Sequence, residues 1–207
     1  MFGLSKKRRK IEGDIGYFNL EDWWLTEFDE NTREYIVEKY QPMGSPPRCL
    51  VEGKYDWTSA NKVSFLSGLG GWLQGPKDRH IARKVYKKAI ELINFSDDPL
   101  DRHFLYQGLI QIYYKDRNDS ECYNLAIEYC KKQIAMQSEA AKKWQEDYPN
   151  DTLPAHHGYE QYAIILEKEG RFDEAIELSK EADSNGWSGS WKNRIERCTK
   201  KIEKSKE

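Results

Sequence analysis

Apolar residues recur at spacings of three and four along most of the chain after residue 57, which is the period of helices with one buried face. Polar residues and helix breakers such as Gly75-Pro76, Tyr148-Pro149 and Gly170 separate successive stripes. The first four expected inward sets are Val63, Leu66, Leu69, Gly70 and Leu73; Ile81, Ala82, Val85, Tyr86, Ala89, Ile90 and Ile93; Tyr106, Leu109, Ile110 and Tyr113; and Leu125, Ala126, Tyr129, Cys130 and Ile134. Alternation typical of strands is absent, so the pattern predicts an all-α protein.

The helix boundaries follow from local signals. Asp98, Pro99 and Asp101 form a start signal, with a capping side chain, proline at the first helical position and an acidic third position. We expect the fourth helix to begin near Ser120 and to continue as far as Trp144. Three more helices are expected. The first presents Tyr159, Tyr162, Ala163 and Leu166 inward, and the second runs from Phe172 to Ala182. The last runs from Ser190 to about Lys204, with Trp191, Ile195, Cys198 and Ile202 inward.

The N-terminal part has a different character. Residues 1–16 are basic and contain three glycines, so we expect a flexible leader, followed by an aromatic segment and a Pro/Gly loop over 17–57 and the helical body over 58–207. Asn31 and Glu34 have the spacing of a capping box, which predicts a helix from 31 to Tyr40. The expected role of the aromatic set is to dock on the helical body. That set is Trp23, Trp24, Phe28, Tyr35 and Tyr40.

Charge and composition narrow the possible environment. No apolar run approaches the roughly 20 residues of a membrane span, and no apolar stretch follows the basic start as it would in a secretory signal. The four cysteines are scattered, which favours reduced thiols in a cytoplasmic protein. The net charge is −2, and residues 6–10 alone carry +5, which leaves −7 on the rest. Nucleic acid is therefore a poor expected partner. The basic run Lys6 to Lys10 is interpreted as a solvated tail, with contact to nucleic acid or an anionic membrane surface, or an import signal, as the alternatives.

Three segments share one repeated pattern. The most complete is Tyr159-x-x-Tyr162-Ala163-x-x-Leu166-x-x-x-Gly170-x-Phe172-x-x-Ala175, and related patterns occupy 66–89 and 106–130. The pattern resembles the tetratricopeptide repeat (TPR), and segments such as Asp101-Arg-His-Phe are similar to bacterial TPR-containing proteins with no assigned activity. The resemblance implies three stacked helix pairs and a C-terminal capping helix. The equivalent alanines Ala82, Ala126 and Ala175 are 44 and 49 residues apart, against about 34 in the regular repeat, so irregular stacking is expected.

The resemblance also implies a function, namely binding of a protein or peptide on the concave face formed by the first helix of each pair. The positions carried over are Ser64, Ser67, Gly71 and Gln74; Phe104, Gln107, Gln111, Tyr114 and Lys115; and His157, Glu160, Ile164 and Glu167. These positions lack the Lys/Asn set with which some TPR domains hold a terminal carboxylate. The alternative is a structural or self-associating protein whose groove is filled by its own N-terminal segment.

Catalysis finds little support in the sequence. No nucleophile motif or phosphate-binding glycine loop occurs, and the four histidines do not form a metal-ligand spacing. We therefore expect no catalytic residue, no cofactor and no metal.

Overall fold

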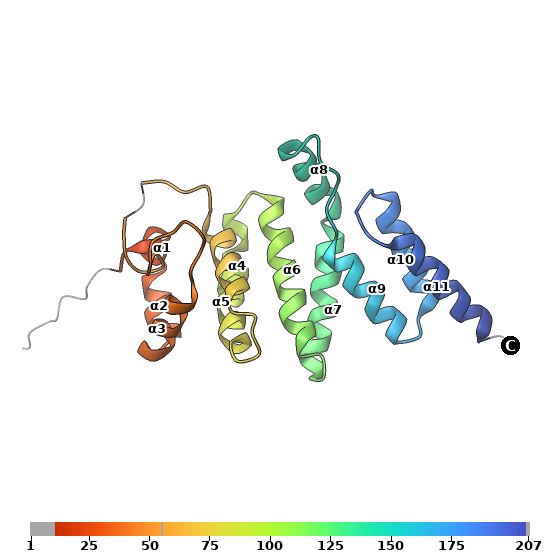
Figure 1. The fold of residues 1–207 in the computed structure, drawn as a ribbon, viewed down its shortest axis with the longest axis horizontal. Helices are drawn as coiled ribbons and strands as arrows, with labels where there is room; N and C mark the ends of the chain where they lie inside the picture. Colours follow the sequence, from red (N-terminus) through yellow and green to blue (C-terminus); the bar gives the residue numbers. More distant parts are fainter. Residues whose placement is uncertain (1–10, 55, 206–207) are drawn as a thin grey trace, which may run out of the picture.

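The computed structural model describes residues 11–54 and 56–205, and within them the chain is all-α (Figure 1). The helices are α1 (Gly13–Tyr17), α2 (Glu21–Glu27), α3 (Glu30–Lys39), α4 (Lys62–Trp72), α5 (Arg79–Glu91), the 3₁₀ helix η1 (Ile93–Phe95), α6 (Pro99–Lys115), α7 (Ser120–Ala135), α8 (Gln137–Asp147), α9 (His157–Lys168), α10 (Phe172–Ser184) and α11 (Trp191–Lys204). Figure 1 shows them side by side in one row, from α1–α3 at one end to α11 at the other, with α8 projecting from one edge. No strand forms in these residues, although Ala155 and Ser188 share an isolated bridge.

The helical body follows the apolar periodicity closely. All five residues of the first predicted stripe are buried, and so are Ala82, Ala126 and Ala175, each with no exposed surface. The start signal before α6 is confirmed, because the Asp98 carboxylate accepts a hydrogen bond of 2.8 Å from the backbone N–H of Leu100. Gly170, predicted to close α9, has a φ of +76°, a left-handed conformation that glycine adopts without strain.

Tyr86 is the central side chain of the first half of the row. Its ring is 1% exposed, in the same core cluster as side chains of α4 and α6. A Cβ added to Gly70 on α4 would lie 2.7 Å from this ring, and one added to Gly108 on α6 would lie 2.6 Å from its hydroxyl oxygen. The two glycines therefore let α4 and α6 close on both sides of one aromatic ring.

The expected fourth helix is divided. The prediction of one helix from Ser120 to Trp144 is wrong, because α7 ends at Ala135 and α8 begins at Gln137. Met136 between them has φ −102° and ψ 9°, outside the helical range. After this break α8 packs beside α6 instead of extending away from the row, and Ala140 is fully buried there. No glycine or proline marks the break in the sequence, so only the tertiary contact of α8 explains it.

The cap of α3 also differs from the expectation. The helix begins one residue earlier than predicted, and its N-cap is Asp29, whose carboxylate accepts a 2.8 Å hydrogen bond from the backbone N–H of Thr32. The predicted capping box of Asn31 and Glu34 does not form, and Glu34 instead binds Arg48.

This difference can be tested by two alanine substitutions. Asp29→Ala is expected to lower the free energy of unfolding by about 1 kcal/mol, because it leaves a helix N–H without its acceptor. Asn31→Ala should change it by less than about 0.5 kcal/mol. Urea titrations followed by circular dichroism measure both. An equal or larger loss for Asn31→Ala would contradict the assignment of Asp29 as the cap.

The N-terminal segment is more ordered than expected. Residues 13–16, placed in the flexible leader by sequence, belong to α1, and the backbone N–H groups of Gly13, Asp14 and Ile15 donate to carbonyls of residues 49–53. Gly13 has a φ of +62°, and a Cβ there would lie 2.3 Å from the Cys49 carbonyl oxygen. The basic run Lys6 to Lys10 lies outside the described residues.

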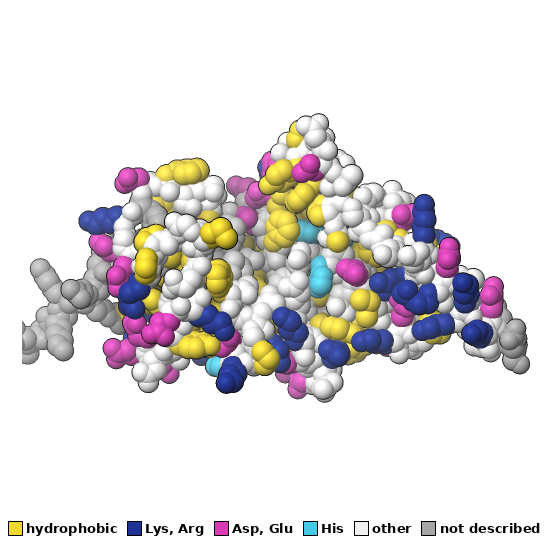
Figure 2. All heavy atoms as spheres, in the orientation of Figure 1, with side chains coloured by type: hydrophobic (Ala, Val, Ile, Leu, Met, Phe, Trp, Pro, Cys, Tyr) yellow, Lys and Arg dark blue, Asp and Glu magenta, His cyan; other side chains and the backbone are white. Residues whose placement is uncertain are grey.

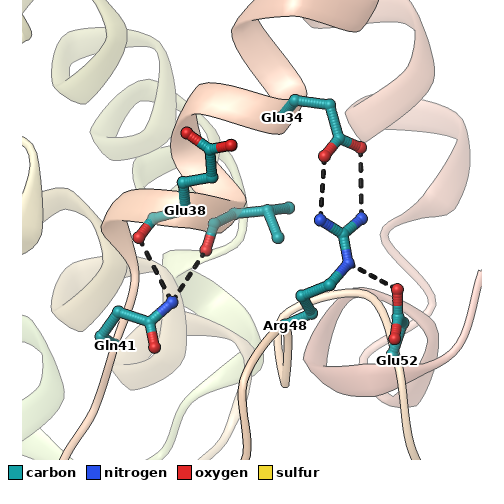
Figure 3. A network of polar contacts seen from close by, with 6 residues as sticks. Glu34, Glu38, Gln41, Arg48 and Glu52 are labelled. Atoms are coloured by element: carbon teal, nitrogen blue, oxygen red, sulfur yellow. Dashed lines mark hydrogen bonds and ion pairs between the residues drawn. The ribbon is translucent and has the colours of Figure 1, made fainter.

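Four of the five aromatic residues of the N-terminal segment pack on the body as predicted, whereas Tyr35 is 41% exposed and its hydroxyl donates to Asp78 at 2.7 Å. Trp24 and Phe28 are 1% and 3% exposed, and they share a core cluster with side chains of α4 and α5. On its outer side the loop after α3 is fixed by Arg48, whose guanidinium donates to both Glu34 oxygens at 2.9 and 3.2 Å and to Glu52 at 2.5 Å (Figure 3). The segment therefore covers the end of the row beside α4 and α5. No helix in the described part of the chain is long and apolar enough to cross a membrane.

Candidate binding face

A chain of hydrogen bonds joins the first helices of the three pairs across one side of the row. Gln74, just after α4, donates to Gln111 on α6 at 3.2 Å, and its carbonyl oxygen accepts from Lys115 at 2.9 Å. Lys168 on α9 donates to the Tyr114 hydroxyl at 2.9 Å, with its Nζ 5.4 Å from the centre of that ring. We call these five residues the polar face. Four of them were predicted site residues; Lys168 was not.

The remaining predicted positions differ in their exposure to solvent. Ser67, Gln107 and His157 are half-buried, Phe104 is 42% exposed and Glu160 is exposed. A Cβ at Gly71 would meet no atom within 4 Å, so backbone is open to a ligand at this point of α4. Ser64 has a structural use, since its hydroxyl accepts from the Asn61 N–H in the capping box of α4.

Ile164 and Glu167 line a shallow hollow of about 420 Å³ together with residues that the sequence analysis did not select. These are Lys168, Arg197 and Lys201, two of them from α11. The Arg194-x-x-Arg197 spacing, which places both side chains on one face of α11, is the signal that could have identified this contribution. Figure 2 shows Lys and Arg side chains gathered over α9 and α11.

Glu167 anchors α11 to α9. Its Oε1 accepts from Arg194 at 2.6 Å and its Oε2 accepts from Arg197 at 2.9 Å. Burial alone would raise the pKa of Glu167, but the hydrogen bond from Arg197 and the nearby charge of Arg194 outweigh burial and hold the pKa below its usual range. Glu167 therefore stays ionised at neutral pH, and its two arginines are held in place. Because Glu167 already holds these two arginines, its predicted role as a contact in the groove is limited.

Two of the four histidines, one on α6 and one just before α9, are buried together. The rings of His103 and His156 lie 4.9 Å apart, edge to face, and the His103 ring stacks on Trp187 at 5.6 Å. Burial lowers the pKa of His103 to about 4 and that of His156 to about 3, so both are neutral at pH 7. Both rings are at most 2% exposed. A dissolved substrate cannot reach them, so we assign them to packing.

The same joint is fixed by Gln133 of α7. Its amide N–H donates to the His103 carbonyl at 2.9 Å, and its amide oxygen accepts from the Gly158 N–H at 2.6 Å. One buried side chain thus connects α6, α7 and α9. These two hydrogen bonds therefore help to fix the positions of the three helices relative to one another.

Other reactive groups do not form a site. Cys49, Cys122, Cys130 and Cys198 are all buried, and burial raises the pKa of Cys130 to about 12, which leaves little thiolate at neutral pH. Among the described residues no group of three or more His, Cys, Asp or Glu is placed to hold a metal ion.

Comparison with known proteins found no matching protein-family model, no matching curated protein and no matching solved structure. The assignment of function therefore depends on the residues and contacts of this chain alone.

Proposed function

We propose that this protein is a non-catalytic, TPR-like scaffold that binds an extended or helical segment of another protein across α4, α6 and α9. The observation that carries the proposal is the polar face, where hydrogen bonds connect Gln74, just after α4, to α6 and connect α9 to α6. Hydrogen bonding and ring contacts of this kind suit peptide recognition.

Packing of the helices supports the TPR-like part of the proposal. Each of the three pairs buries an alanine at the equivalent position of its second helix, and α6 contacts both helices of the preceding pair. Small residues at helix crossings allow such close stacking, and α11 covers the last pair. The long steps between the equivalent alanines are absorbed by the η1 connection and by α8.

Two further observations concern the partner and the compartment. Residues 11–54 pack at the end of the row beside α4 and α5, which favours a foreign segment on the polar face over the chain's own N-terminal segment. The burial of all four cysteines, with Cys122, Cys130 and Cys198 as free thiols, favours a cytoplasmic location. A protein partner is favoured over nucleic acid because the chain beyond its first ten residues is acidic.

The test is partner capture with a matched pair of variants. A Gln111→Ala, Tyr114→Ala double variant is expected to lose at least about tenfold in affinity for a partner captured by wild type from the native host, because an aromatic ring and its polar neighbour are typical anchors. Capture by quantitative mass spectrometry, followed by titration of the purified partner, measures the change.

The control makes the same two substitutions outside the polar face. Gln145 and Tyr148, at the exposed end of α8, give a Gln145→Ala, Tyr148→Ala variant that should bind like wild type. Unchanged binding by the Gln111→Ala, Tyr114→Ala variant would show that the polar face is not the binding site.

A further inference from the structure

Two surface hollows lie between helices on the side of the row away from the polar face, and their charges are opposite. The basic hollow, of about 240 Å³, has a floor of Leu109 and Tyr113 from α6 and a rim of Arg83, Lys84 and Lys87 from α5. Its apolar floor and cationic rim fit an acidic, partly apolar surface.

The acidic hollow, of about 690 Å³, has its floor at the equivalent positions of α9, and its rim is formed by α10, the second helix of the same pair. Its floor is Tyr162 and Leu166 from α9, and its rim includes Asp173, Glu177 and Glu181 from α10. The Leu166 side chain is 1% exposed, so it forms the bottom of the hollow and the acidic side chains stand around it.

Both hollows open on the same side of the molecule. In α6, the floor residues Leu109 and Tyr113 come two residues after positions of the binding face. In α9, the floor residues Tyr162 and Leu166 come two residues after the equivalent positions. Since two residues along a helix correspond to about 200° of rotation, the hollows face away from Gln107 and Gln111.

Net charge changes sign along the second helices that border these hollows. Helix α5 carries five basic residues and one glutamate, α7 carries two glutamates and two lysines, and α10 carries five acidic residues and one lysine. The side of the row formed by these helices is therefore basic at one end, neutral in the middle and acidic at the other end.

We propose that two copies of this chain associate through this side, antiparallel about a two-fold axis near α7. Each basic hollow and the α5 helix beside it then faces the α10 helix and acidic hollow of the second copy. Because the pattern is self-complementary, both contacts form at once and the assembly closes as a dimer. The polar face points outward in both copies and remains open to a peptide.

Some rim charges already have partners within the chain. Lys84 binds Glu27 at 2.9 Å, and Glu177 binds Lys180 at 2.8 Å. Lys87 and Asp173, by contrast, are exposed and make no ion pair with any described residue. They are the rim groups most available to a second copy.

Sedimentation velocity of the full-length chain tests the proposal directly. We expect a concentration-dependent dimer at about 0.05 M salt that dissociates substantially at about 0.5 M, where charges separated by more than a few ångströms are screened. A monomer at both salt concentrations would overturn the proposal, and so would growth beyond the mass of a dimer.

Charge reversal tests the pairing of the two helices. Lys87→Glu and Asp173→Lys should each raise the dimer dissociation constant by at least about tenfold, because each places like charges opposite one another twice per dimer. An equimolar mixture of the two variants should recover the dimer, since α5 of one variant then matches α10 of the other in both contacts. A mixture that stays monomeric contradicts the antiparallel pairing.

The matched controls lie on α8, away from both hollows. Lys142→Glu and Glu146→Lys alter the same charges at exposed positions and should leave the dissociation constant unchanged. If these controls raise the dissociation constant equally, the association depends only on net charge and the proposed surface is wrong. Capture of a peptide partner is a separate measurement, so failure of either proposal leaves the other intact.

Discussion

Replacing Tyr86 with alanine is expected to lower the free energy of unfolding by about 3–5 kcal/mol, the range for removing a large buried ring. The ring fills the space between Gly70 and Gly108, and its hydroxyl accepts a 3.1 Å hydrogen bond from Gln74 of the polar face. Loss of the ring leaves a cavity between α4 and α6 that neither backbone can close. Denaturant titration followed by circular dichroism measures the loss.

Substitutions at glycines provide the control for this prediction. Gly70→Ala and Gly108→Ala should each cost about 1–3 kcal/mol, because the added methyl group overlaps a ring that has no room to move. Gly68→Ala lies in the same helix as Gly70, but a Cβ there meets no atom within 4 Å, so it should stabilise the protein by about 0.5–1 kcal/mol. If all three alanines behave alike, Tyr86 is not held between the two helices.

Acidification from about pH 7.5 to about pH 5 is expected to reduce the free energy of unfolding by on the order of 4 kcal/mol, about 2 from each buried histidine. His103 and His156 have folded pKa values of about 4 and about 3, below the ordinary value of 6.5. In this pH range the unfolded chain binds protons that the folded chain does not, so stability falls as pH falls. Above about pH 7 neither state is protonated and the effect disappears.

A single substitution separates this effect from general acid unfolding. His103→Phe keeps an aromatic ring against Trp187 and removes a nitrogen, Nδ1, that has no hydrogen-bond partner. It should therefore remove about half of the pH dependence between pH 7.5 and 5, measured by urea titration at each pH. A pH dependence equal to that of wild type would show that His103 is not buried as a neutral ring.

The sequence predicted the long helices well because their apolar residues recur with one period and their ends carry strong signals. Asp98-Pro99 is a local start signal and Gly170 is a local stop signal, and the structure confirms both. The prediction from sequence failed where a short helix or a helix end depends on contacts with residues far away in the chain. Helix α1 exists because Gly13 and its neighbours bond to residues 49–53, and the end of α7 at Met136 depends on the contact of α8 with α6. Neither contact can be read from local periodicity.

For the candidate site, helical phase predicted Gln74, Gln111 and Lys115, which hydrogen bonds bring together, and Tyr114, which is bonded to Lys168 of α9. The contribution of α11 was missed, because that helix was interpreted only as a polar cap. The burial of His103 and His156 was missed for a different reason. Histidine is compatible with both core and surface, and Trp187, which packs on both rings, is far away in the chain.

The division at Met136 has a consequence for how this chain can change in length. Since α8 is accommodated at the edge of the row, the helix pairs on either side keep their mutual packing even though an extra helix separates them in sequence. A change in the length of this connection would therefore alter the edge of the row and leave the packing of α7 against α9 in place.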